Sequence, residues 1–159
     1  MAPAPRRTAE NDNLAIETQL CFALYSATLA LGKTYAPVLA RIGLTYPQYL
    51  VMLVLWQQDG LTVGALGQQL HLESGTLTPM LKRMEQAGHV LRTRDKADER
   101  LVRISLTGAG RTLRAKALNV PCTIGDAMGL PTERLAAIRD ELLTIRHSME
   151  AAVRRPVPG

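Results

Sequence analysis

The sequence predicts a mainly α-helical protein: a winged helix-turn-helix DNA-binding domain whose N- and C-terminal helices form a homodimerisation region. The hydrophobic content is 47% but the aromatic content only 4%, a composition typical of helical proteins. Two helical patterns are separated by the three-residue break "HLE", and two short strand-like runs follow the second pattern. Helix, short turn, helix and hairpin is the order of elements in a winged helix-turn-helix.

The length of 159 residues suits one compact domain. We expect a flexible arm over residues 1–12, a helical dimerisation region over 13–45 and 108–153, and the winged helix-turn-helix over 46–107. No apolar run approaches the ~20 residues of a membrane span, and the N-terminus lacks the apolar core of a signal peptide. These features predict a cytoplasmic protein without membrane contact, whose two cysteines are resting thiols.

The first helix is expected to begin at Asn13 or a neighbour and to be apolar on almost every side. Its apolar residues are Leu14, Ile16, Leu20, Phe22, Leu24, Leu29 and Leu31. Because such a helix must be buried all round, a second copy of the chain is its expected partner. Pro37 is expected to kink or restart the helix, and Gly43 to end it.

A second helix should start near Pro47 and run to the turn at Asp59 and Gly60. Thr62 is a plausible N-cap for the third helix. The apolar residues of this third helix at helical spacing are Val63, Leu66 and Leu70.

The fourth helix follows the "HLE" break and is closed by Gly88, with either Ser74 or Thr76 as its N-cap. If Thr76 is the N-cap, Pro79 lies in the first turn and removes no backbone hydrogen bond of the helix. If Ser74 is the N-cap, Pro79 removes one. One face of the helix carries the apolar stripe Leu77, Met80, Leu81, Met84 and Ala87. The opposite face carries Gly75, Thr76, Pro79, Lys82, Arg83 and Gln86.

Two strand-like runs come next, over residues 89–94 and 100–107. The second run alternates, with Val102, Ile104 and Leu106 on one side and polar residues on the other. A long helix is then expected from Gly108 to about residue 120, followed by a turn around 125–131 and a last helix over 132–153.

Basic residues are concentrated between Lys82 and Lys116, where ten lysines and arginines face four acidic residues. This segment has a net charge of +6 and the remainder of the chain −1, which indicates a polyanion contact. The fourth helix offers small residues and a hydroxyl at its N-terminus and amide and cationic side chains beyond, which suits base edges and phosphates. Arg94, Lys96 and Arg100 in the hairpin loop suit a minor groove.

The segments "ESGTLTPMLKRMEQAG" and "RTRDKADERLVRISLTGAG" resemble the recognition helix and wing of the MarR family, with the wing signature "DER" at residues 98–100. "LCFALYSA", "KTYAPVL" and "LTYPQYLVMLVLW" narrow the resemblance to the organic hydroperoxide resistance regulators, over about residues 20–121. The resemblance implies a homodimer that represses a peroxidase gene from a pseudo-palindromic operator in double-stranded DNA. It also implies release of that DNA once an organic hydroperoxide oxidises one cysteine.

The same resemblance assigns roles to individual residues. Cys21 takes the sensor position, Tyr35 and Tyr46 the tyrosines that hydrogen-bond it, and Tyr25 a further place in the pocket. The positions that match DNA contacts are Ser74, Gly75, Thr76, Pro79, Lys82 and the wing residue Arg100. Cys122 is either a resolving cysteine or a passive residue. Oxidation can therefore end as an intersubunit disulfide, as a mixed disulfide with a low-molecular-weight thiol, or as over-oxidation.

A peroxide-sensing cysteine must react as a thiolate. Cys21 is expected about two turns into its helix, too deep for the helix dipole, and no cation lies beside it at helical spacing. The two phenol hydroxyls that the resemblance places at the sulfur could stabilise the anion by hydrogen bonding. On a continuous helix Tyr35 would lie ~21 Å from Cys21. Tyr46 is expected near Tyr35, at the end of the helix that is distant from Cys21. The site therefore closes only if an antiparallel second subunit supplies the tyrosines.

Two other functions remain open at this point. A regulator of the same fold that is released by a phenolic or antibiotic-like ligand would not need Cys21. A small thiol peroxidase would usually place a cation beside the sulfur, and the sequence offers none there. His71, His89 and His147 form no ligand-spaced pair with either cysteine, so we expect no metal, no cofactor and no enzymatic activity.

Overall fold

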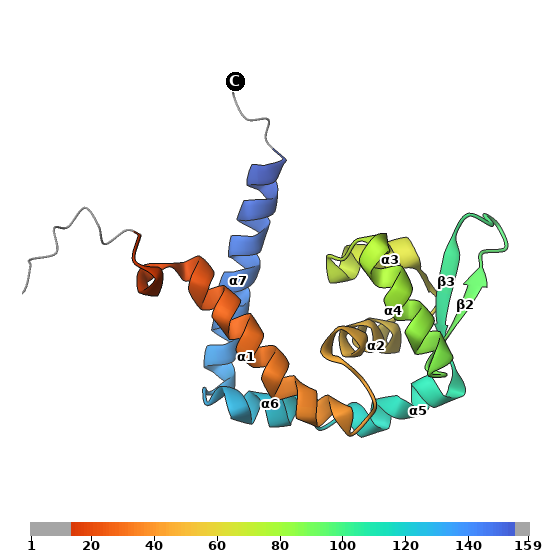
Figure 1. Ribbon diagram of the computed structural model, residues 1–159, viewed down its shortest axis with the longest axis horizontal. Helices are drawn as coiled ribbons and strands as arrows, with labels where there is room; N and C mark the ends of the chain where they lie inside the picture. The colour runs from red at the N-terminus through yellow and green to blue at the C-terminus, as the bar shows by residue number, and fades with distance from the viewer. Residues whose placement is uncertain (1–13, 155–159) are drawn as a thin grey trace, which may run out of the picture. The chain divides into compact units, whose positions relative to one another are not determined.

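The computed structural model describes residues 14–154, so the predicted arm over residues 1–12 lies outside the described residues. The chain divides into two compact units, residues 1–118 and 119–159. The helices of the first unit are α1 (Leu20–Ala40), α2 (Tyr46–Gln57), α3 (Val63–Leu70), α4 (Ser74–Gln86) and α5 (Gly108–Ala117), shown in Figure 1. Its strands are β1 (Leu61–Thr62), β2 (Val90–Arg94) and β3 (Val102–Leu106). The helices of the second unit are α6 (Val120–Met128) and α7 (Thr132–Val153).

The first helix begins at Leu20, later than the predicted start near Asn13. A separate 3-10 turn, Ile16–Thr18, precedes it, and the Thr18 hydroxyl and amide both donate to the Ala15 carbonyl. Gln19 is extended and interrupts the helical hydrogen bonding, which explains the late start. The helix then continues through Pro37 without a restart.

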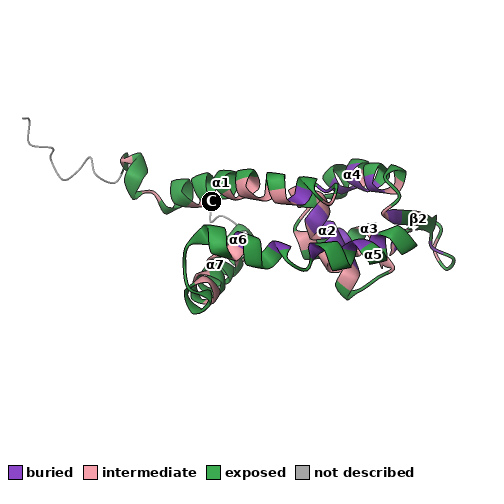
Figure 2. Cartoon of the chain, turned by 90° about the horizontal axis from the view of Figure 1, so that it is seen from below, coloured by how far each residue is buried: buried purple, intermediate pink, exposed green. Residues whose placement is uncertain are grey.

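Most of α1 is exposed in the single chain, as Figure 2 shows. Leu39 is its only buried residue, whereas Leu20 is 56%, Phe22 41% and Leu29 51% exposed. Lys33 is the only charged residue in the helix. Helix α1 is therefore apolar on almost every side, as the sequence predicted. Within the first unit, most of these apolar side chains remain uncovered.

The helix-turn-helix follows the predicted order. The Gln48 side chain accepts the Thr45 amide at 2.9 Å at the start of α2, and the Thr62 hydroxyl caps α3 by accepting the Ala65 amide at 3.2 Å. After α3 the chain reverses at Leu72, whose amide donates to the Gly67 carbonyl at 2.9 Å. A side chain at Gly67 would meet the Leu72 carbonyl oxygen at 2.6 Å, so the tight turn requires glycine there.

Helix α4 has Glu73 at its N-cap, so neither Ser74 nor Thr76 holds that position. Pro79 consequently lies inside the helix and cannot donate a backbone hydrogen bond. The predicted apolar stripe is buried at Leu77, Met80, Leu81 and Met84. Ala87 is exposed instead, because the helix ends at Gln86 and Ala87 no longer follows its periodicity.

The three strands form an antiparallel sheet in the order β1-β3-β2. The β2–β3 hairpin is the predicted wing, with Val90 opposite Leu106 and Arg94 opposite Val102. Ile104 and Leu106 are buried, in agreement with the predicted alternation. Strand β1 was not predicted, since its two residues are too short for a periodic pattern.

The helix predicted from Gly108 to about residue 120 ends at Ala117, and α6 was not predicted as a separate helix. Pro121 explains the break, because it lacks the N–H that would continue the hydrogen bonding of α5. The last helix, Thr132–Val153, is confirmed. Within residues 14–154, no helix combines the length and the apolar character that crossing a membrane demands.

Candidate functional site

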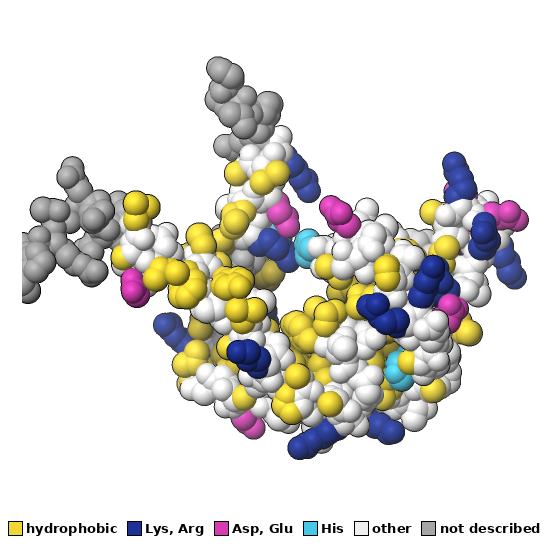
Figure 3. All heavy atoms as spheres, viewed as in Figure 1, with side chains coloured by type: hydrophobic (Ala, Val, Ile, Leu, Met, Phe, Trp, Pro, Cys, Tyr) yellow, Lys and Arg dark blue, Asp and Glu magenta, His cyan; other side chains and the backbone are white. Residues whose placement is uncertain are grey.

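The outer face of α4 is open to solvent over its whole length. The exposed residues are Ser74, Gly75, Thr76, Pro79, Lys82, Arg83 and Gln86, which are the residues predicted to contact DNA. Figure 3 shows lysine and arginine side chains gathered over this helix and the β2–β3 hairpin. A helix of this kind fits the major groove, with its small residues where the backbone approaches base edges most closely.

The wing loop is held by the buried carboxylate of Asp95, which is 7% exposed. It accepts the amides of Ala97 at 2.8 Å and Asp98 at 3.1 Å, and it also accepts the Arg103 guanidinium. Arg103 in turn donates to the Gly60 carbonyl at 2.8 Å. The Ala97 amide first, and then Arg103, hold the pKa of Asp95 below its usual value.

The wing cations project from this fixed loop. Arg100 is 89% exposed and forms a two-point ion pair with Asp98, both N–O distances being 2.9 Å. This pairing holds the pKa of Asp98 below its usual value. Arg94 donates to the Glu99 carbonyl at 3.3 Å, and Lys96 is exposed. The three predicted wing cations therefore lie on one hairpin.

The wing and α4 are also tied to each other. The Glu85 carboxylate of α4 accepts the Arg92 backbone amide of β2 at 2.9 Å, and the Arg92 guanidinium lies 3.6 Å from the other carboxylate oxygen. This contact fixes the start of the hairpin against the end of α4. The two elements that would enter neighbouring grooves are thus directly linked.

Cys21 is exposed and is the second residue of α1, in its first turn and not two turns into the helix as predicted. No side chain caps this helix end. The amides of a first turn have no partner inside the helix, and the positive end of the helix dipole favours a negative charge there. The structure therefore places Cys21 beside the start of the helix, a position that the sequence prediction had excluded.

Tyr35 and Tyr46 are brought together, as predicted, where α1 ends and α2 begins. Their ring centroids are 4.4 Å apart with an interplanar angle of 39°, and both are half-buried. Burial, together with Tyr46 and then Tyr49, raises the pKa of Tyr35 to about 12, and burial raises the pKa of Tyr46. Both phenols therefore keep their protons at neutral pH and remain hydrogen-bond donors.

Cys21 does not lie with these tyrosines in its own chain. It shares the continuous helix α1 with Tyr35, and their separation in sequence corresponds to ~21 Å along the axis. Tyr25 follows Cys21 by one turn on the same side of the helix and is 61% exposed. A single chain therefore holds the thiol at one end of α1 and the phenol pair at the other.

Sequence reasoning missed two aromatic residues of α2. Tyr49 is 3% exposed, and its ring centroid lies 5.9 Å from that of Tyr35 and 6.4 Å from that of Trp56. Tyr46, Tyr49 and Trp56 lie three and seven residues apart, a spacing that places them along one side of a helix. This spacing could have indicated from the sequence that Tyr49 and Trp56 lie on the same side of the helix as Tyr46.

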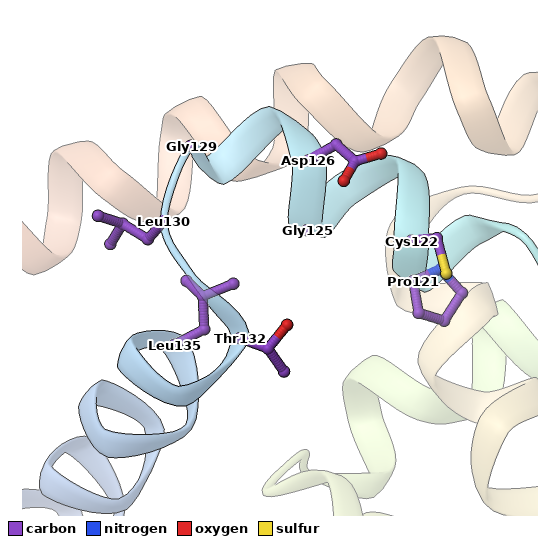
Figure 4. A pocket seen from close by; sticks show the side chains of 8 residues that line it. All are labelled: Pro121, Cys122, Gly125, Asp126, Gly129, Leu130, Thr132 and Leu135. Carbon is purple, nitrogen blue, oxygen red and sulfur yellow. The ribbon is translucent and has the colours of Figure 1, made fainter.

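Cys122 lies in the second unit, near the start of α6, and is exposed. It borders a hollow of about 570 Å³, seen in Figure 4. The hollow is lined by Pro121, Cys122, Gly125, Asp126, Gly129, Leu130, Thr132 and Leu135. Among the residues that the structure describes, no three His, Cys, Asp or Glu side chains are grouped as a metal site would require.

Comparison with known proteins gives consistent matches. Residues 33–116 match the family model described as transcriptional regulator SarA/Rot. The chain is 46% identical over 153 residues to the HTH-type transcriptional regulator TtmR of Methylorubrum extorquens, covering 93% of this chain and 78% of that one. It is 46% identical over 138 residues to the organic hydroperoxide resistance transcriptional regulator of Bacillus subtilis, covering 87% and 94%. Reduced AbfR bound to DNA is similar in structure, with a TM-score of 0.73, 35% identity and coverage of 87% and 96%.

Proposed function

The chain belongs to the organic hydroperoxide resistance regulators of the MarR family and also matches the SarA/Rot model of transcriptional regulators, and from that premise we propose a specific mechanism. The reduced homodimer holds a pseudo-palindromic operator in the cytoplasm. Oxidation of Cys21 by an organic hydroperoxide then releases the DNA. The observation that carries this proposal is the pairing of Tyr35 with Tyr46 at the opposite end of α1 from Cys21.

The exposed apolar surface of α1 supports the homodimer. Leu20, Phe22 and Leu29 are each 41–56% exposed, on a helix with a single charged residue. A second copy of α1 lying antiparallel would bury these side chains. The same arrangement would bring the partner's tyrosine pair to this chain's Cys21, which closes two equivalent sites per dimer.

The chemistry of such a site is a two-electron oxidation of sulfur. The Cys21 thiolate attacks the outer oxygen of the hydroperoxide, the O–O bond breaks, and the alkoxide leaves as an alcohol after taking up a proton. The product is a sulfenic acid. The phenol hydroxyls of Tyr35 and Tyr46 donate hydrogen bonds to the thiolate before attack, and the apolar side chains around Cys21 favour an organic peroxide over hydrogen peroxide. A second thiol then condenses with the sulfenic acid and releases water.

The release of DNA follows from the dimer geometry. Two recognition helices read half-sites about one turn of DNA apart, ~34 Å, so their separation decides affinity. A new covalent group on Cys21 lies inside the proposed dimer contact, where it would displace the paired helices. Each thiol reacts once and is not turned over, which distinguishes this protein from a thiol peroxidase.

The test measures binding of the reduced protein to a duplex selected by that protein from a random library. Cumene hydroperoxide should release wild type and leave Cys21→Ser bound, with equal affinity of both proteins before oxidation. Release of Cys21→Ser by the peroxide would refute the mechanism, and a phenolic ligand that releases both proteins would favour the ligand-controlled regulator.

Cys122→Ser serves as the matched thiol control in the same experiment. Because Cys122 is exposed, we propose that the partner's Cys122 is the second thiol. A non-reducing gel after one equivalent of peroxide should show a crosslinked wild-type dimer that Cys122→Ser does not form. Monomer in both samples would rule out Cys122 as the second thiol.

A further inference from the structure

A chain of aromatic contacts runs from the tyrosine pair to the base of the wing. Tyr35 contacts Tyr49 with ring centroids 5.9 Å apart, and Tyr49 meets the edge of Trp56 at 6.4 Å. The Trp56 indole Nε1–H donates to the Gly110 carbonyl of α5 at 2.9 Å. Among the described residues, this is the side-chain hydrogen bond that links α2 to α5.

Gly110 lies at a junction that includes the end of the recognition helix α4. The Thr107 hydroxyl accepts the Gly110 amide at 2.9 Å and donates to the Gly88 carbonyl at 2.6 Å. The Thr107 amide donates to the His89 carbonyl at 3.1 Å. A side chain at Gly110 would come within 2.1 Å of the His89 carbonyl oxygen, so α5 and the α4–β2 turn lie in direct backbone contact.

These contacts leave little room for independent motion. Tyr49 is 3% exposed, and interiors packed at protein density respond to a displacement by shifting together. The pKa of Tyr49 is raised by burial and by Tyr46, so the ring is uncharged and is held by packing. A movement of the Tyr35–Tyr46 pair would therefore reach Trp56 through Tyr49, and α5 through the indole hydrogen bond.

We propose that Trp56 is a positioning residue that couples the tyrosine pair to the α4–β2–α5 junction, so that oxidation at the thiol site changes the placement of the recognition helix. This inference rests on the proposed function, because it requires Tyr35 and Tyr46 to change their contacts when Cys21 is oxidised. The bistable element is the α2–α5 contact, with the indole hydrogen bond made in the DNA-bound arrangement and broken in the released one.

Trp56 is the only tryptophan in the chain, so its fluorescence reports this contact directly. Emission of wild type should shift on addition of cumene hydroperoxide, because the indole loses its partner and its surroundings change. Cys21→Ser should show no shift. An unchanged wild-type spectrum, in a sample whose DNA has been released, would overturn the proposal.

The second arm uses Trp56→Phe, which keeps a ring and removes the donor. The reduced variant should bind the selected duplex about tenfold more weakly than reduced wild type, because the lost hydrogen bond belongs to the DNA-bound arrangement. Oxidised variant and oxidised wild type should bind equally, so the fold-decrease in affinity on oxidation should shrink by about tenfold, in the range of known coupling energies. Titration of Cys21 with peroxide should stay stoichiometric. Tyr49→Phe is the matched control, because it keeps the ring and should keep full release.

The outcomes separate this inference from the proposed function. If Cys21→Ser blocks release and Trp56→Phe releases as fully as wild type, the coupling role is wrong and the sensor mechanism stands. If Cys21→Ser still releases DNA, the sensor mechanism itself fails. Should Trp56→Phe not fold, Tyr49→Leu tests the same chain of contacts, and full release by that variant would also refute the coupling.

Discussion

The rings of Tyr35 and Tyr46 lie with their centroids 4.4 Å apart, which joins the last turns of α1 to the first turn of α2. Each chain therefore assembles the phenol half of the proposed sensor on its own. The thiol half lies at the start of the same α1 helix, beyond reach within one chain. In the proposed mechanism, a site divided in this way is complete only in the assembled dimer.

The first prediction concerns the hydroxyl groups of this pair. Tyr46→Phe keeps the ring packing against Tyr35 and removes one of the two proposed hydrogen bonds to the thiolate. Such a bond to a charged group contributes about 1.5–3 kcal/mol, so the rate of Cys21 oxidation by cumene hydroperoxide should fall at least tenfold. Stopped-flow loss of free thiol measures the rate. Tyr49→Phe is the control, and equal rates for the two variants would show that Tyr46 does not contact the thiolate.

The second prediction concerns alkaline pH. The pKa of Tyr35 is about 12 in the folded chain, compared with an ordinary value of 10.0. The Tyr35 phenol therefore loses its proton at a lower pH in the unfolded chain than in the folded chain. The stabilising contribution of neutral Tyr35 is therefore complete below pH 10 and is lost as pH rises toward 12. Thermal unfolding between pH 9 and 12 should show a steeper decline in Tm for wild type than for Tyr35→Phe. Parallel curves would contradict the raised pKa.

The sequence predicted most of this architecture because its signals are local. The periodicity of Leu77, Met80, Leu81 and Met84 identified the buried face of α4, and the alternation of Ile104 and Leu106 identified the wing. The family resemblance identified Tyr35 and Tyr46, which the structure brings together. The predictions for α4 and the wing needed only spacing along one element, whereas the tyrosine pair was found through the resemblance.

The remaining features depend on contacts between distant segments. Trp56 and Gly110 are far apart in sequence, and nothing local to either residue indicates their hydrogen bond. The buried Asp95 reads as an ordinary charged loop residue until Arg103 and the loop amides surround it. The late start of α1 was missed because Leu14 and Ile16 extend the apolar pattern of the helix toward the N-terminus, and hydrophobicity alone does not reveal the extended backbone at Gln19.

The third prediction compares two glycines of α3. A Cβ at Gly67 would lie 2.6 Å from the Leu72 carbonyl oxygen, whereas a Cβ at Gly64 meets nothing within 4 Å. Gly67→Ala should therefore lower the free energy of unfolding by about 1–3 kcal/mol, because the turn between α3 and α4 must open. Gly64→Ala should raise it by about 0.5 kcal/mol through helix propensity. Urea unfolding measures both, and equal effects would show that the turn is not close-packed.

The fourth prediction concerns the wing cation Arg100, which is 89% exposed and held toward solvent by its ion pair with Asp98. On DNA the guanidinium would exchange this carboxylate for the minor groove, where the negative potential is concentrated. Arg100→Ala should weaken binding of the selected duplex by about tenfold and reduce the slope of log affinity against log salt by about 1.

Arg139→Ala is the matched control for Arg100→Ala. Arg139 is an exposed arginine that is also paired with an aspartate, Asp140 at 2.8 Å, but it lies on α7 outside the winged helix-turn-helix. Its removal subtracts the same charge from the protein and should leave both affinity and salt slope unchanged. Fluorescence anisotropy between 50 and 300 mM salt compares the two variants. Equal losses would mean that overall charge, and not the wing, attracts the DNA.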